Sequence, residues 1–97
     1  MEDNETRIDL TKPPAGWSAV STGIGVRYRL GYHFEATTHF VVDVTYFPSS
    51  REAKIDGPFK VSRKGRATPG TVPVEALAFA HTRTPVLLLW LAKAAKQ

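Results

Sequence analysis

The chain has 97 residues, no cysteine and a formal net charge of +4 at pH 7. The absence of cysteine excludes disulfide bonds, thiolate zinc sites and thiol catalysis. A chain of this length predicts a domain that buries roughly two thirds of its unfolded surface without a metal or disulfide.

The first residues differ in charge from the rest of the chain. Residues 1–9 carry a local charge of −3, whereas residues 10–97 carry +7. We expect residues 1–6 to form a disordered acidic leader and residues 7–97 to form a single domain. The leader has no apolar run typical of a signal peptide, and the most apolar stretch, 86–92, is far shorter than the roughly 20 residues that cross a bilayer. A cytoplasmic protein without membrane contact is expected.

Residues 7–11 predict a short edge strand that Pro13 and Pro14 end. Residues 15–25 predict a short strand or irregular segment, which turns at Gly23-Ile24-Gly25. Residues 26–47 then alternate apolar and polar side chains in two runs, which indicates a long antiparallel hairpin.

The register of this hairpin follows from matching its apolar faces. A two-residue loop at 36–37 would set Phe34 against His39, so a three-residue loop at 36–38 is preferred. That loop predicts four apolar cross-strand pairs: Phe34–Phe40, Tyr32–Val42, Leu30–Val44 and Tyr28–Tyr46.

Residues 51–55 and 59–63 predict a second hairpin around Asp56-Gly57-Pro58, in which Ile55 pairs with Phe59. Alanine and leucine then become frequent, and two helices are predicted. The first covers residues 73–81, and the second runs from Pro85 to about Lys96 with Thr84 as its N-cap. The fold prediction is therefore α+β: an antiparallel sheet of four to five strands, packed on one face by a C-terminal helical pair. The last helix is apolar nearly all round, which suggests a homodimer through it.

The most basic segment lies between residues 51 and 66. Lysine and arginine neutralise phosphates and release counterions, so this segment predicts nucleic-acid binding through a basic hairpin and loop, with help from Arg27 and Arg29. A two-stranded ribbon can enter a major groove. The candidate residues of the segment are Arg51, Lys54, Lys60, Arg63, Lys64 and Arg66.

Three further side chains, His33, Glu35 and His39, are predicted to share the polar face of the long hairpin, with Glu35 opposite His39. Two histidines and a carboxylate can hold a divalent metal or exchange protons. An ordinary solvated strand face is the simpler interpretation, and no metal or other cofactor is expected.

The preferred function is a small non-enzymatic binding or regulatory module that contacts nucleic acid. The alternative is an inhibitor or accessory protein that docks on an acidic protein surface through Val41, Phe47 and Trp90. A metal or acid/base site at the histidines is the third hypothesis. No nucleophile or phosphate-loop motif is present, and no catalytic residue is assigned.

Overall fold

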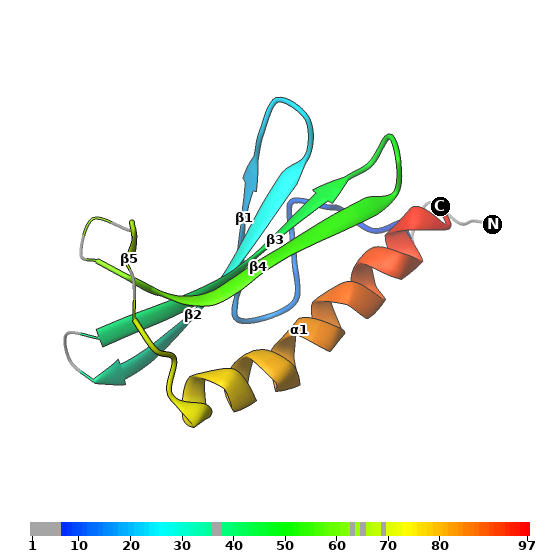
Figure 1. Ribbon diagram of the computed structural model, residues 1–97. Coiled ribbons are helices and arrows are strands. Elements are labelled where there is room, and N and C mark those ends of the chain that lie inside the picture. Colours follow the sequence, from blue (N-terminus) through cyan, green and yellow to red (C-terminus); the bar gives the residue numbers. More distant parts are fainter. Residues whose placement is uncertain (1–6, 36–37, 63, 65, 69) are drawn as a thin grey trace.

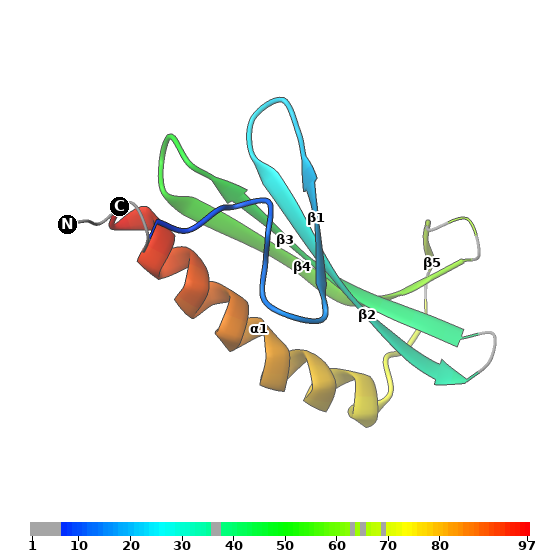
Figure 2. The same ribbon diagram turned by 180° about the vertical axis from the view of Figure 1, so that it is seen from behind.

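The computed structural model describes residues 7–35, 38–62, 64, 66–68 and 70–97. They form a five-stranded antiparallel sheet in the order β1-β2-β3-β4-β5 and one C-terminal helix on one face of it (Figures 1 and 2). The predicted α+β class is confirmed. The elements are β1 (Trp17–Ser21), β2 (Val26–Glu35), β3 (Thr38–Phe47), β4 (Glu52–Val61), β5 (Ala67–Thr68) and α1 (Val74–Ala95).

The hairpin of β2 and β3 keeps the predicted faces but not the predicted partners. Its pairs are Tyr32–Phe40, Leu30–Val42, Tyr28–Val44 and Val26–Tyr46. Every partner in β3 is thus two residues closer to the turn than predicted. The reason is a bulge. Between His33 and Glu35 the register shifts, since β2 advances two residues while β3 moves from His39 to Thr38. The bulge places one extra residue in β2. With this extra residue, a two-residue connection no longer sets the apolar face of one strand against the polar face of the other.

The predicted second hairpin is wrong, because β4 is one continuous strand of 10 residues along β3. Asp56-Gly57-Pro58 forms an irregularity inside it, where the register shifts between Val41 and Asp43 of β3. Gly57 has φ 96°, and an added Cβ there would lie 2.8 Å from the carbonyl oxygen of Val41. A turn-forming sequence thus becomes a bulge, because the free edge of β3 offers ladder bonds over the whole strand.

The helical pair is also wrong. One helix of 22 residues passes through Pro85, and it starts after Pro73, so Thr84 is an interior residue and not an N-cap. Proline inside a helix costs about 3 kcal/mol relative to alanine. Burial on both sides of it offsets this cost, because Ala76 and Ala80 before Pro85 lie on the same helix face as Leu87 and Leu91 after it.

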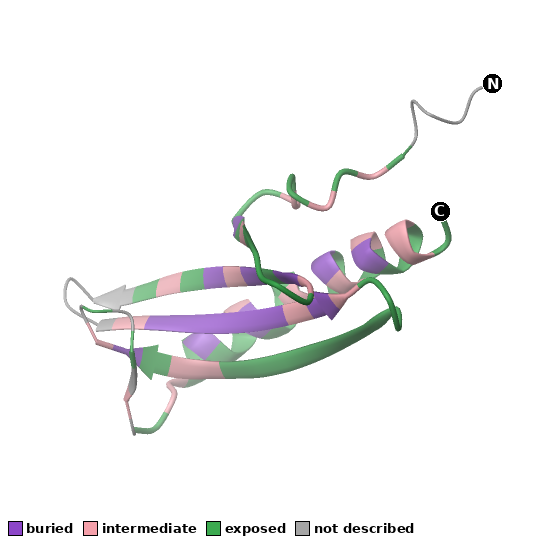
Figure 3. Cartoon of the chain, turned by 90° about the horizontal axis from the view of Figure 1, so that it is seen from above, coloured by how far each residue is buried: buried purple, intermediate pink, exposed green. Residues whose placement is uncertain are grey.

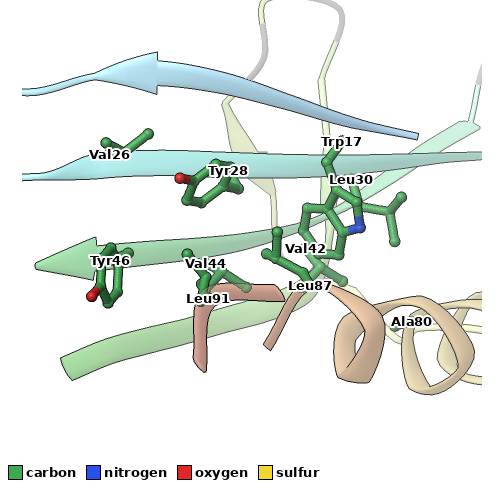
Figure 4. Packing of buried hydrophobic residues seen from close by; sticks show 10 residues of the cluster. All are labelled: Trp17, Val26, Tyr28, Leu30, Val42, Val44, Tyr46, Ala80, Leu87 and Leu91. Atoms are coloured by element: carbon green, nitrogen blue, oxygen red, sulfur yellow. The ribbon is translucent and has the colours of Figure 1, made fainter. Parts of the chain in front are cut away.

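The core lies between α1 and the inner face of the sheet, the face that α1 covers (Figure 4). Tyr28 is fully buried there, and the edge of its ring meets Trp90 with ring centroids 5.7 Å apart. Its hydroxyl donates to the carbonyl oxygen of Leu10 at 2.7 Å. Burial raises the pKa of Tyr28 to about 12.

Residues 7–11 form no strand, contrary to the expectation. The Asp9 carboxylate accepts hydrogen bonds from the backbone N–H and hydroxyl of Thr11, at 2.9 and 2.6 Å. These bonds favour a local turn over an extended ladder. Leu10 then packs against the core, so this segment covers the inner face beside α1.

Candidate functional site

The outer face of the sheet, opposite α1, carries most of the polar residues that were singled out. Figure 3 looks onto this face: β3 is buried along most of its length, whereas β4 is mainly exposed. The register places side chains on it in cross-strand rows. In order along the sheet, the rows are Val20–Arg27–Thr45–Lys54, Ser18–Arg29–Asp43–Asp56, Gly31–Val41–Phe59 and His33–His39–Val61.

Arg29 and Asp43 form a two-pronged ion pair at the centre of this face. The Nε and Nη2 atoms of Arg29 donate to the two carboxylate oxygens of Asp43 at 2.7 and 2.8 Å. These bonds raise the pKa of Arg29 above its usual value. Asp43 is only 8% exposed. Arg29 is therefore committed to a partner within the sheet and is a poor candidate for a phosphate contact.

His33 lies directly opposite His39, in the position that was predicted for Glu35. Their rings stack with centroids 4.1 Å apart and an interplanar angle of 16°. The His39 ring also covers Gly31, where an added Cβ would come within 2.8 Å of Nε2. Desolvation lowers the pKa of His39, and the charges of His33 and Arg29 lower it further. The lowered pKa favours the neutral form of the His39 ring near pH 7.

The predicted third member of this group, Glu35, is opposite Thr38 in the register. Its side chain lies outside the part of the chain that the structure describes. Among the described residues, no group of three His, Asp or Glu side chains is placed to hold a metal ion.

The basic residues of the segment 51–66 do not form one patch, because the segment is not a hairpin. Arg51 lies at the turn between β3 and β4, and Lys54 lies on the outer face beside Thr45. Lys60 pairs with Phe40 and thus lies on the inner face. A strand of ten residues spans about 33 Å, so these cations are spread along the molecule.

Two cations of the segment, Lys64 and Arg66, are exposed in the turn that follows β4. The turn is closed by a bond from the Ser62 N–H to the Arg66 carbonyl oxygen at 2.8 Å, and by one from the Arg66 N–H to the Ser62 hydroxyl at 3.3 Å. Val61, directly before the turn, pairs with His39. The structure thus brings this basic turn and the stacked histidines to one end of the sheet. Arg63 lies outside the described residues.

The predicted protein-contact residues are not grouped. Val41 is on the outer face, between Gly31 and Phe59 in the register, but it is only 2% exposed. Phe47 is half-buried at the end of β3, and Trp90 packs against Tyr28 in the core. Val41 is therefore not available to a partner in this structure.

A groove between α1 and β4 is a feature that the sequence patterns did not indicate. It has a volume of about 470 Å³ and is lined mainly by apolar side chains. A smaller hollow of about 160 Å³ extends it toward the C-terminus of α1. Leu88 borders both, and the other lining residues include Ile55, Pro58, Leu77, Thr84 and Ala95. The sequence feature that could have indicated this groove is the apolar character of the last helix, because one sheet face cannot cover all of its apolar side chains.

Comparison with protein-family models, curated proteins and solved structures finds no match to this chain. No helix within the described residues has the length and apolar character needed to cross a membrane.

Proposed function

We propose that this chain is a small non-enzymatic binding module for single-stranded nucleic acid. The binding site is the end of the outer face formed by the ring pair His33–His39, the half-buried Phe59, and the described residues of the basic turn, Ser62, Lys64 and Arg66. The observation that supports this proposal most is that the turn with the exposed Lys64 and Arg66 follows Val61, which pairs with His39, so the cations and the stacked rings lie at the same end of the sheet.

Proteins that bind single strands combine cations along the backbone path with aromatic surfaces on which bases stack. In this chain the stacked histidines and the cations of the turn after β4 lie at the same end of the sheet, because Val61, which precedes the turn, pairs with His39. Stacking contributes about 1–3 kcal/mol per base, and each phosphate contact adds salt-dependent affinity.

The width of the sheet favours a single strand over a duplex. Four strands at about 4.8 Å spacing make a surface about 19 Å wide, whereas a major groove is about 12 Å wide. A free two-stranded ribbon could enter the groove, but β4 is paired to β3 along its length. Bases that are already unpaired can instead lie flat against the open face.

The test is fluorescence anisotropy of a labelled single strand, titrated at about 50 and 200 mM salt. The variant Lys64→Glu/Arg66→Glu reverses two charges in the basic turn, and we expect it to weaken binding at least about tenfold and to flatten the salt dependence. Lys60→Glu is the matched control, since it changes the same kind of charge on the opposite face and should leave most affinity.

Two results contradict the proposal: no binding at the lower salt, or equal losses in the Lys60 and Lys64/Arg66 variants. The second result would indicate diffuse charge attraction without a site. His33→Ala/His39→Ala tests the ring surface, and its loss of affinity should persist at high salt because stacking is less screened than phosphate pairing.

The protein-binding alternative has its own observation, which is the apolar groove between α1 and β4. An exposed apolar groove indicates a contact surface for another macromolecule.

A further inference from the structure

The helix α1 presents more apolar surface than the sheet covers. Residues of a helix advance about 100° each, so Leu89 projects about 200° away from the fully buried Leu87 and is 67% exposed. Leu77 and Leu88, on the flank toward β4, line the groove. The apolar arc thus extends from the sheet-facing side, across the groove, to the side that faces away from the sheet.

The inner face of the sheet has a complementary uncovered strip along β4. A helix is about 10 Å wide and four strands are about 19 Å wide, so α1 covers only part of the face, and the segment with Leu10 covers another part. The part left uncovered carries Ile55, which is 49% exposed, and Pro58. Figure 1 shows the helix in this position, along one face of the sheet. One more helix would fill the strip.

We propose that the groove is occupied by α1 of a second copy of this chain. In this dimer the two helices pack side by side and antiparallel between two sheets, and each helix lies in the groove of the other copy. Leu89 of each copy then meets the strip of Ile55 and Pro58, while the Leu77–Leu88 flanks of the two helices meet each other.

Three properties favour a second copy over another occupant. The groove and its hollow run along α1 from Leu77 to Ala95, about 27 Å at 1.5 Å per residue, and α1 itself supplies an apolar helix of that length. The groove and the exposed Leu89 side of α1 lie next to each other. One twofold axis therefore places Leu89 of each copy in the groove of the other copy. Antiparallel packing also sets the helix dipoles in opposite directions, with favourable interaction of their ends.

The size of the contact is sufficient. A helix flank about 33 Å long and a sheet strip about 27 Å long, each about 10 Å wide, give a contact area of roughly 600 Å² per copy when both surfaces are treated as flat. Stable interfaces bury about 600–1,000 Å² per partner, so this contact lies at the lower end of that range. The proposal is independent of nucleic-acid binding, because its residues lie on the opposite face from the stacked histidines.

Sedimentation velocity on the full chain over about 1–50 µM should give twice the monomer mass of 10.7 kDa. Leu89→Asp places a carboxylate in each apolar contact, and we expect it to raise the dimer dissociation constant more than about 100-fold. Ile55→Thr keeps a strand-forming residue and should raise it about tenfold. Ile24→Asp is the control, since Ile24 is 74% exposed in the turn between β1 and β2.

Circular dichroism of each variant checks that it is folded; Leu89 and Ile24 are largely exposed, so substitution there should not unfold the monomer. A monomeric parent chain overturns the proposal, as does a dimer that Leu89→Asp leaves intact. A dimer that responds to Leu89→Asp but not to Ile55→Thr also overturns it, because the helix would then contact its partner without entering the groove.

Discussion

At the scale of single residues, the outer face of the sheet holds two kinds of polar group. Arg29 and Asp43 satisfy each other through two short hydrogen bonds. His33 and His39 stack on each other, with His33 exposed and His39 half-buried. The ion pair therefore contributes to stability, whereas the ring pair is the better candidate for binding.

The ion pair predicts a measurable loss when one partner is removed. Asp43→Ala leaves the Arg29 guanidinium without its acceptor in a partly enclosed position. Breaking a buried pair costs about 3–5 kcal/mol, but the Arg29 side chain is 34% exposed, and solvent reduces the penalty. We expect a loss of about 1–2 kcal/mol in urea unfolding. Asp56→Ala, on the same face but exposed, should change stability by less than about 0.5 kcal/mol. Equal effects would refute a special role for Asp43.

The histidine pair predicts a pH dependence of stability. The pKa of His39 is lowered in the folded state, so the unfolded chain binds a proton more readily between the folded pKa and the usual histidine pKa of 6.5. The contribution of His39 to stability is complete above pH 6.5 and is lost as the pH falls through that range. In His39→Gln, this part of the decrease in the unfolding midpoint should be absent. A slope identical to that of the parent chain would contradict the assignment.

At the scale of elements, the structure joins pieces that the sequence patterns separate. Two predicted helices are one helix, and two predicted strands of a hairpin are one strand. In both cases a local break signal, Thr84-Pro85 or Asp56-Gly57-Pro58, lies inside an element that packs or pairs on both sides of it. A neighbouring surface of sufficient length outweighs the local preference.

The continuous helix predicts an unusual result for its proline. Pro85→Ala restores a backbone N–H inside α1, and we expect an increase in the free energy of unfolding of about 1–3 kcal/mol. Thr84→Ala should cost less than about 0.5 kcal/mol, because Thr84 caps nothing. If a second helix began at Pro85, Thr84→Ala would instead cost about 1 kcal/mol. Urea unfolding of the two variants distinguishes these cases.

At the scale of the whole molecule, the two sides of the sheet have different properties. The outer side carries charged residues, stacked rings and the ion pair, and the inner side carries the core and an apolar groove beside β4. In the proposed dimer the grooves meet at the centre and the two outer faces point away from each other. Each copy then offers its own basic turn and ring pair to a nucleic-acid strand.

The amino-acid sequence by itself determined the α+β class, the long hairpin and the faces of its strands, because a period of two in hydrophobicity follows directly from the pleat. It also indicated the excess of apolar surface on the last helix. Only the tertiary structure decided which residues pair, because a one-residue bulge after His33 changes every partner without changing any face. It likewise decided that Val61 lies beside His39 on the outer face while Lys60 lies on the inner face, since the register shift at Gly57-Pro58 reverses the alternation of β4. Bulges depend on the balance of ladder bonds across neighbouring strands, and this balance is set by residues far apart in the sequence.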